Sequence, residues 1–286
     1  MDNIGIVTDN ISSLPEKIVQ KYQIETVKTK LFFPEAEKFP EKNLYQIMEE
    51  TKAYPKTSAP SPGDFVKVYK KLSRRFQKIL VITLSSHLSG TYNSAFQAKE
   101  FLEDPSRIEL VDSKHAVAGE GLLTLKAIEL VQQTGDIEEI KNKLENFKQE
   151  IKMVAFLKNT FWVEKIGRMT GQQVWLFQTL KSLGIQPIIG IKKGRVGFTG
   201  FNFGSRDVFK AIFHQLYYHS QRIRRRFKVT MRVGINYTNN IGLAYDLKEK
   251  IEKELGAEVT FVSLVPPIVG ANSGPGTLIA ACHPKV

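Results

Sequence analysis

Short apolar runs alternate with helical patterns along the first half of the chain. The apolar runs predict strands at 4–8, 79–84 and 108–111, and an extended segment at 24–33. Apolar residues at helical spacing predict a short helix ending at residue 22 and further helices at 41–50, 62–76, 89–103 and 116–133. Repeated strand–helix units are typical of a parallel sheet with helices on both faces.

The second half of the chain has a different pattern. It predicts helices at 136–151, 161–166, 173–180, 206–221 and 241–255, and strands at 151–157, 229–237 and 259–264. A β-hairpin is expected at 187–198, with its turn at Lys193 and Gly194. We therefore predict a two-domain α/β protein. Its N-terminal α/β domain (1–157) contains a parallel sheet with flanking helices, and its C-terminal α/β domain (158–286) contains a mixed or antiparallel sheet.

The composition is that of a globular protein, with 42% hydrophobic and 24% charged residues in 286. The one cysteine, Cys282, lies in an apolar run, which predicts a buried thiol and excludes an intrachain disulfide. The chain opens directly on a strand-like run, with no signal-peptide pattern. No apolar stretch approaches the roughly 20 residues that a membrane span needs. We expect a cytoplasmic protein.

Positive charge is clustered at two places. Lys and Arg number 41 against 29 Asp and Glu, giving a net charge of +12, and the excess gathers at 70–78 and at 222–228. Solvated basic faces explain this pattern, and so does an anionic membrane surface or an acidic protein partner. Nucleic acid ranks last because no known nucleic-acid-binding module accompanies the charge.

A hydroxyl-rich turn at 85–95 directly follows the predicted strand at 79–84 and leads into a helix. A helix N-terminus directs backbone N–H groups toward one point, which suits an anion. A simpler interpretation is that Ser89 caps the helix and Gly90 eases the turn. Polar residues at 9, 85–89 and 112–113 all follow predicted parallel strands, so we expect them along one edge of the sheet.

A search for catalytic motifs finds little. The chain has no Gly-x-x-x-x-Gly-Lys-Ser/Thr phosphate loop, no Gly-x-Gly-x-x-Gly after a strand and no Gly-x-Ser-x-Gly. Its five histidines form no metal-binding spacing, since His214 and His219 are five residues apart and do not share a helical face. We expect neither a metal nor a cofactor. Asp9 and Asp112 are the candidates for an acid or base, should the protein be an enzyme.

Polar motifs recur in a recognisable order along almost the whole chain. They are Val-Thr-Asp-Asn at 7–10, Thr-Ser-Ala-Pro-Ser-Pro-Gly at 57–63, Ser-Ser-His-Leu-Ser-Gly-Thr-Tyr at 85–92, Val-Asp-Ser-Lys at 111–114, Gly-Arg at 167–168 and Gly-Pro-Gly at 274–276. Together they resemble the pattern of the DegV family, with Ala59 at a position where the family has Gln.

The resemblance implies a protein without catalysis of its own that binds a long-chain fatty acid between two α/β domains. In many bacteria such proteins are the acyl-carrying subunit of fatty acid kinase. By position, Thr57, Ser89 and Gly90 match the family's carboxylate-binding turns, and Arg168 matches an arginine that contacts the head group or a partner. The N-terminal domain would hold the head group and the C-terminal domain the acyl chain. Apolar helices at 174–177 and 208–218 would line the tunnel or pack in the core.

Two positions depart from the family pattern. Asn272 stands where the family usually has a histidine ligand, and an amide can donate a hydrogen bond but carries no charge. Phe201 and Phe203 stand where kinase-coupled members tend to have a basic pair. These departures weaken the expectation of a kinase partner more than that of lipid binding. Two alternatives remain: an enzyme acting on a small carboxylate or phosphorylated substrate, and a basic adaptor for membrane or nucleic acid.

Overall fold

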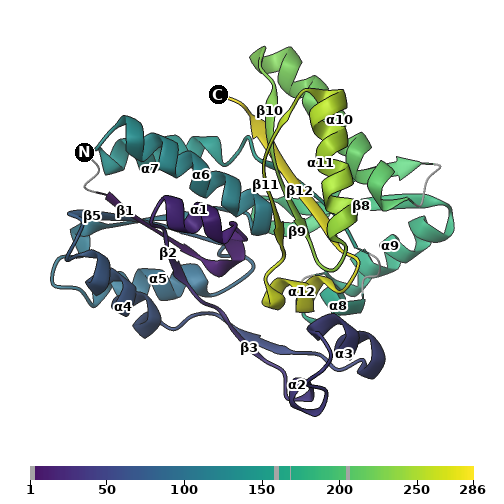
Figure 1. The fold of residues 1–286 in the computed structure, drawn as a ribbon, viewed down its shortest axis with the longest axis horizontal. Helices are drawn as coiled ribbons and strands as arrows, with labels where there is room; N and C mark the ends of the chain where they lie inside the picture. Colours follow the sequence, from purple (N-terminus) through teal and green to yellow (C-terminus); the bar gives the residue numbers. More distant parts are fainter. Residues whose placement is uncertain (1–3, 158–160, 168, 204–206) are drawn as a thin grey trace. The chain divides into compact units, whose positions relative to one another are not determined.

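The computed structural model describes residues 4–157, 161–167, 169–203 and 207–286. Its contacts divide the chain into two compact units (Figure 1). The first unit holds the residues up to Lys30 together with Ser58–Ile151, and the second holds Leu31–Thr57 together with Lys152–Val286. This division differs from the predicted domains at 1–157 and 158–286, because the segment 31–57 groups with the second unit. The assignment of head group and acyl chain to separate domains stays a prediction.

The first unit contains the predicted parallel sheet. Its strands are β1 (Ile4–Asp9), β2 (Glu25–Val27), β5 (Lys78–Thr83) and β6 (Ile108–Asp112), in the order β2-β1-β5-β6, and every pairing is parallel. Val81 on β5 pairs with Val7 on β1 and with Leu110 on β6. The near-continuous apolar sequence of these strands is explained by burial on both faces.

Helices cover both faces of this sheet, as the alternating pattern predicts. They are α1 (Glu16–Lys21), α4 (Pro62–Leu72), α5 (Thr91–Glu100), α6 (Val117–Gln133) and α7 (Ile137–Phe147), with the short 3₁₀ helices η1 (Asn10–Ser12) and η2 (Pro105–Arg107). Phe65, Tyr69 and Leu72 of α4 pack on one face with Ala95 of α5. Helix α6 covers the opposite face (Figure 1). Ser61 caps α4 and Pro62 opens it, at the predicted start of this helix.

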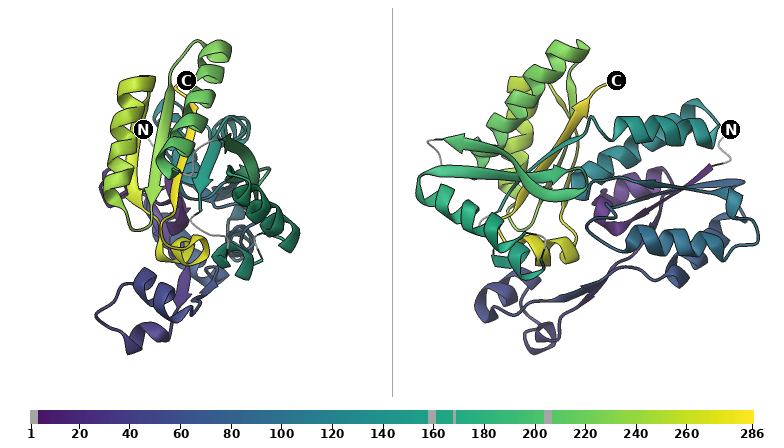
Figure 2. Two further views of the ribbon diagram at one scale, coloured as in Figure 1. Left: turned by 90° about the vertical axis from the view of Figure 1, so that its right-hand side faces the viewer. Right: turned by 180° about the vertical axis from the view of Figure 1, so that it is seen from behind.

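The second unit contains a mixed sheet, also as predicted. Its strands are β7 (Lys152–Phe156), β8 (Ile185–Lys192), β9 (Arg195–Phe203), β10 (Met231–Tyr237), β11 (Glu258–Leu264) and β12 (Leu278–Pro284), in the order β11-β10-β12-β7-β8-β9. Only the β10–β11 pairing is parallel among those described. β8 and β9 form the predicted hairpin at one edge (Figure 2), turning at Lys193 and Gly194 with φ of 50° and 82°.

The helices of the second unit that follow β7 pack in separate apolar clusters. They are α8 (Phe161–Lys165), α9 (Gly171–Ser182), α10 (Val208–Phe227), α11 (Ile241–Leu255) and α12 (Pro267–Ser273). Helices α10 and α11 share a cluster with the sheet, to which α10 contributes Ile212, Leu216 and Ile223. Helices α8 and α9 form another cluster with Ile189 of β8. Hydrophobic burial of this kind is worth about 25 cal/mol per Å².

The segment 31–57 forms a small subdomain of the second unit. The strands β3 (Lys30–Phe32) and β4 (Lys56–Ser58) pair as a two-stranded ribbon, and α2 (Glu35–Lys38) and α3 (Leu44–Thr51) lie between them along the chain (Figure 1). Ile47 and Met48 of α3 are buried with Trp162 of α8 and Ala271 of α12. This shared apolar cluster explains why the segment groups with the second unit.

Several elements differ from the sequence predictions, among them α10, α12 and β12. Helix α10 continues to Phe227, beyond the predicted end at 221, because Ser220 and Ile223 extend its buried face while the arginines beyond them stay exposed. Residues 267–273, where the sequence predicts no helix, form α12, and the apolar run around Cys282 is the central strand β12. Cys282 is buried, as predicted. Among the described residues, no helix is long and apolar enough to cross a membrane.

Candidate functional site

Polar groups gather at the carboxyl edge of the first unit's sheet. β1 ends at Asp9, β5 runs into Leu84 and the hydroxyl-rich turn, and β6 ends at Asp112. These strands are parallel neighbours, so their carboxyl ends meet at one edge. The prediction that the residues at 9, 85–89 and 112–113 share this edge is confirmed.

Asp9 ties the end of β1 to the end of β5. Its side chain is fully buried and accepts hydrogen bonds from the backbone N–H groups of Ile11 and Leu84, both at 2.9 Å. Burial raises the pKa of Asp9 to about 6, although those two N–H groups oppose the shift. Asp9 therefore fixes the backbone at the start of the turn that carries Ser85 and Ser86.

Glu120 of α6 is the buried partner of Asp9. The Thr8 hydroxyl donates a 3.1 Å hydrogen bond to Glu120 Oε1, and the carboxyl groups of Glu120 and Asp9 are electrostatically coupled. Burial and the negative charge of Asp9 raise the pKa of Glu120 well above its usual value. The two buried carboxyl groups therefore titrate as a coupled pair, in which Glu120 is the harder to ionise.

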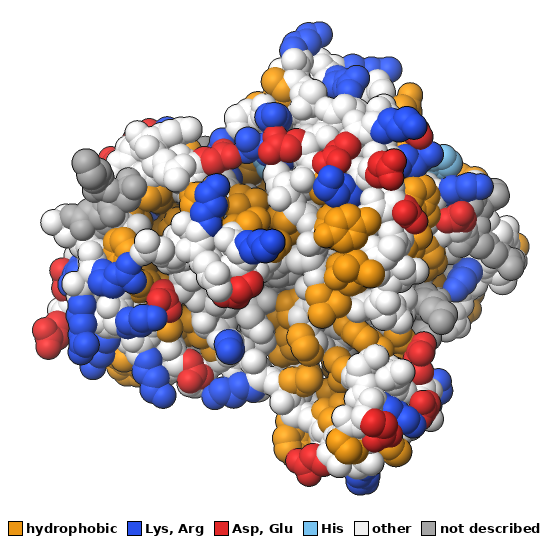
Figure 3. Space-filling view, viewed as in Figure 1, with side chains coloured by type: hydrophobic (Ala, Val, Ile, Leu, Met, Phe, Trp, Pro, Cys, Tyr) orange, Lys and Arg blue, Asp and Glu red, His pale blue; other side chains and the backbone are white. Residues whose placement is uncertain are grey.

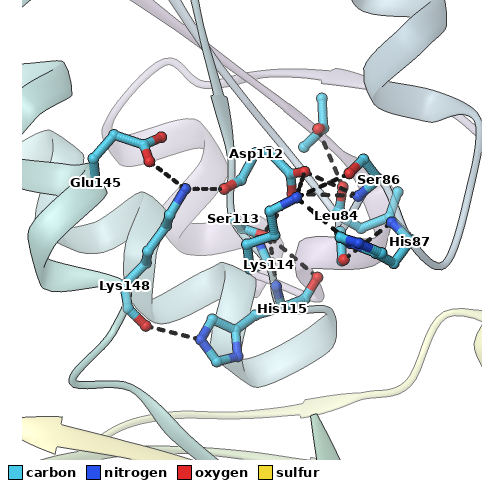
Figure 4. Close-up of polar contacts among 11 residues, drawn as sticks. Leu84, Ser86, His87, Asp112, Ser113, Lys114, His115, Glu145 and Lys148 are labelled. Atoms are coloured by element: carbon cyan, nitrogen blue, oxygen red, sulfur yellow. Dashed lines mark hydrogen bonds and ion pairs between the residues drawn. The ribbon is translucent and has the colours of Figure 1, made fainter. Parts of the chain in front are cut away.

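Asp112 organises the adjoining part of the edge (Figure 4). It accepts from the Lys114 Nζ at 2.6 Å, from the Lys114 backbone N–H at 3.0 Å and from the Ser86 backbone N–H at 3.2 Å. Burial acts to raise the pKa of Asp112, but the hydrogen bonds from Lys114 and Ser86 outweigh it and hold the pKa below its usual value. Lys114 Nζ also donates to Ser86 Oγ at 3.1 Å, so an ionised Asp112 and a cationic Lys114 hold the turn from one side.

The backbone joins the same two turns directly. The Ser85 N–H donates to the His115 carbonyl at 2.7 Å, and the Ser113 N–H donates to the Thr83 carbonyl at 3.1 Å. Behind them, Lys148 Nζ donates to the Asp112 carbonyl at 2.8 Å (Figure 4). The turn after β5 is therefore fixed by backbone bonds and charged side chains before any ligand binds.

Ser89 and Gly90 lie at the start of α5, but Ser89 is not its cap. Gly90 is the N-cap residue, with φ −72° and ψ 2°, and no side chain caps the helix. Ser89 Oγ lies 2.9 Å from Thr91 Oγ1 and accepts from the Thr91 N–H at 3.3 Å. The simpler interpretation in which Ser89 is the N-cap residue is therefore wrong, although its hydroxyl accepts one N–H of the first helical turn. A Cβ on Gly90 would meet no atom within 4 Å.

Thr57 and Asn272 belong to the second unit. Thr57 lies on β4 with its side chain exposed, and Asn272 lies near the end of α12, half-buried. The Tyr54 hydroxyl donates to Asn272 Oδ1 at 2.7 Å. This bond ties α12 to the segment that leads, three residues later, to Thr57.

Close packing holds α12 in place. A Cβ at Gly270 would overlap the Tyr45 hydroxyl, and one at Gly274 would overlap the Trp162 ring. Gly274 also has φ 79°, which side-chain-bearing residues rarely adopt. Glycine at these two positions allows α12 to approach α3 and α8 closely.

The remaining predicted positions fall elsewhere. Arg168 lies outside the described residues. Phe201 and Phe203 of β9 are exposed, while Asn202 between them is buried and lies 3.1 Å from His214 Nδ1. The apolar face of α10 and residues Val174 and Phe177 of α9 pack in the cores of the second unit, as the core interpretation of these helices predicts.

Sequence reasoning missed the roles of Tyr54, Lys114 and Glu120. An acid in the otherwise apolar run at 117–123 is a signal that would have singled out Glu120. Lys114 belongs to the Val-Asp-Ser-Lys motif at 111–114, but its contact with Ser86 depends on β5 and β6 being neighbours in the sheet. Tyr54 gave no signal, because its partner lies 218 residues away.

Comparisons with known proteins agree over nearly the whole chain. The family model described as "Uncharacterised protein, DegV family" matches residues 3–284. A DegV domain-containing protein from Staphylococcus aureus (strain N315) is 30% identical over 200 residues, which are 68% of each chain. Another from Clostridium acetobutylicum is 33% identical over 205 residues, covering 68% of this chain and 71% of the relative.

Solved structures with the same fold include a DegV family protein from Thermus thermophilus described by its fatty acid binding. It is 25% identical, with a TM-score of 0.83 over 98% of this chain and 99% of that one. DegV from Bacillus subtilis, described as a fatty acid binding protein, is 22% identical, with a TM-score of 0.80 over 100% of both chains. At that identity the second likeness concerns the fold alone.

Proposed function

The chain belongs to the DegV family, and we propose that it binds a long-chain fatty acid through its carboxylate and acyl chain. The observation that carries this proposal is the preformed donor turn at 85–91, in a chain with 25% identity to the Thermus fatty-acid-binding protein along almost its full length. The proposed carboxylate ligands are Thr57, Ser89, Gly90 and Asn272. Arg168 is proposed as a contact of the head group or of a partner.

The physical chemistry of the turn supports an anionic ligand. A buried carboxylate is costly unless hydrogen bonds satisfy it, and α5 begins without a side-chain cap. Ser89 adds a hydroxyl at that helix terminus, where the dipole favours negative charge. The acyl chain would contribute roughly 0.8 kcal/mol for each buried CH₂.

If the protein were an enzyme, it would need an accessible acid or base, and neither of the two candidates, Asp9 and Asp112, is accessible. Asp9 is fully buried and accepts hydrogen bonds from Ile11 and Leu84, and Asp112 is held by Lys114 and Ser86. Both carboxyl groups hold the turn in place. This role is compatible with a binding protein and does not require catalysis.

Gly90 provides a direct test of the carboxylate site. Its backbone angles suit alanine and the space beside it is open, so folding does not require glycine there. We expect Gly90→Ala to keep the wild-type melting temperature and to weaken palmitate binding by delipidated protein at least fivefold, because the added methyl blocks ligand approach. Gly135→Ala, also in open space, is the control. Equal palmitate affinity in both variants would place the carboxylate elsewhere.

A fatty acid kinase subunit is proposed as a weak partner only. Phe201 and Phe203 expose aromatic rings where a basic pair is expected, and Asn272 cannot gain charge as the acyl phosphate forms. We expect Phe203→Arg combined with Asn272→His to raise acyl-phosphate formation with the kinase subunit of the same organism. Robust wild-type activity, unchanged by these substitutions, would contradict this proposal.

The basic segments support an anionic membrane surface as a second proposed partner. Lys70, Lys71 and Arg74 at the end of α4 are exposed, as are the arginines at 224–226 of α10. In Figure 3, Lys and Arg side chains are scattered over the face shown, among acidic and hydrophobic side chains. Nucleic acid is not proposed as a partner, and a cytoplasmic location remains part of the proposal.

A further inference from the structure

The hydrogen bond between Tyr54 and Asn272 determines which atoms of the amide remain for a ligand. An asparagine side chain offers an acceptor oxygen on one side and an NH₂ donor on the other. Tyr54 Oη donates to Oδ1 at 2.7 Å, so the acceptor side of Asn272 is occupied by the protein. The NH₂ side then remains for a ligand.

We propose that Tyr54 is a positioning residue that holds the Asn272 amide with its N–H donors toward the ligand, making the site selective for a carboxylate over a neutral head group. This inference rests on the proposed fatty-acid function. A flipped amide would present Oδ1 instead, and an oxygen acceptor facing a carboxylate is repulsive. Phenol is a good donor and an amide oxygen a good acceptor, so the observed orientation is also the stronger pairing.

Both partners of this hydrogen bond are held by packing. Tyr54 is half-buried against the cluster that contains Ile47, Met48 and Trp162. Asn272 is carried by α12, whose Ala271 is buried in the same cluster. Rigid support of this kind is what orienting a ligand-binding group requires, because a loosely held amide would rotate to suit either kind of head group.

In this arrangement, the replacement of the family's usual histidine by Asn272 has a functional consequence. A histidine changes its charge near neutral pH, whereas an asparagine selects by donor geometry alone. With its oxygen occupied by Tyr54, Asn272 retains the donor role and loses the acceptor role. Selectivity for an anion is therefore built from two neutral side chains.

The test compares two ligands of equal chain length, palmitate and 1-hexadecanol, on delipidated protein. Wild type is expected to prefer palmitate. Tyr54→Phe should weaken palmitate binding about fivefold and leave hexadecanol binding unchanged, because the freed amide can rotate. Asn272→Asp should weaken palmitate binding more strongly, since Tyr54 would hold one carboxylate oxygen and the other would face the ligand. The matched control is Tyr45→Phe, which removes a hydroxyl from the same packing region without touching Asn272.

A double-mutant cycle separates positioning from a general structural role. In an Asn272→Ala background, Tyr54→Phe should have no further effect on palmitate affinity. Equal losses in both backgrounds, or equal losses for palmitate and hexadecanol, would overturn the positioning role. Wild-type protein that binds neither ligand would instead overturn the fatty-acid function, and this inference with it. Thermal unfolding of each variant verifies that the fold is intact.

Discussion

The turn at 84–91 in the first unit and the helix α12 in the second are held in place by different forces. The first is fixed by buried or half-buried charged groups: Asp9 binds the Leu84 N–H, and Asp112 binds Ser86 and Lys114. The second is fixed by apolar packing and by one hydrogen bond to Asn272. A region held by charged groups should lose stability when a hydrogen-bond acceptor is removed. A region held by packing should lose stability when side-chain volume is added.

The largest effect is expected from removing Asp9. Asp9→Ala leaves the buried N–H groups of Ile11 and Leu84 without their acceptor and leaves Glu120 without its partner. We expect the free energy of unfolding to fall by about 3–5 kcal/mol, measured by urea denaturation. The control is Asp104→Ala, which removes an exposed cap of η2 and should cost much less. Equal losses would mean that Asp9 contributes no more than a surface cap.

The packed region should respond to added volume. Gly270→Ala places a methyl group against the Tyr45 hydroxyl, and we expect a loss of about 1–3 kcal/mol in unfolding free energy. Gly171→Ala, at the start of α9 in the same unit, has open space and should cost little. If the two variants unfold alike, close packing of α12 is not what holds Asn272.

Substitutions of the proposed carboxylate ligands in the two regions should weaken ligand binding to different extents. Ser89→Ala and Thr57→Val should each weaken palmitate binding by about 1–3 kcal/mol, because a buried carboxylate would lose a hydroxyl donor. Asn272→Ala should cost the same or less, since it removes one neutral donor among several. Ser94→Ala, one turn further along α5, controls for changes to that helix. Wild-type affinity in all of the Ser89, Thr57 and Asn272 variants would refute the assigned carboxylate site.

The smallest expected effect is a change in pH dependence. A carboxyl whose pKa is higher in the folded chain stabilises the fold below its unfolded pKa, and this contribution is lost as pH rises through the folded pKa. The stabilisation from Asp9 is therefore lost as pH rises from its ordinary pKa of 3.8 to about 6. The stabilisation from Glu120 is lost as pH rises from 4.5 through a folded pKa well above that value. Glu120→Gln replaces the titrating carboxyl by an amide that does not titrate, so the variant should gain stability relative to wild type as pH rises from 5 to 8.

Urea denaturation at each pH measures this difference. Glu139→Gln is the control, because Glu139 is an exposed acid on α7. Its pKa is lowered by the hydrogen bond from Lys143, so it should not reproduce the gain at high pH. A constant difference between wild type and Glu120→Gln across this range would mean that the buried pair does not titrate there.

The two regions also differ in how far the sequence predicts them. The edge of the first sheet was predictable because Asp9, Ser85 and Asp112 each follow an apolar strand, and parallel strands bring their carboxyl ends together. The bonds within it were less accessible, since the pairing of Glu120 with Asp9 depends on how α6 crosses the sheet. Local pattern places residues on elements, but it does not determine which elements are neighbours.

The second region was harder to predict. Its short helix α12 is rich in small residues, such as Gly270 and Ala271, so it resembles a turn. The segment 31–57 joins the second unit through Ile47 and Met48, which contact residues far away in the chain. Contacts between distant segments leave no periodic signal.

Fatty-acid binding is the central claim, and the most direct test is the mass of the purified protein under native conditions. We expect a complex with about one long-chain fatty acid per chain, released by denaturation and identified by lipid extraction, because an apolar site should be occupied in a cell that contains its ligand. Protein that is consistently free of lipid, and that also fails to take up added palmitate or oleate, would contradict the account.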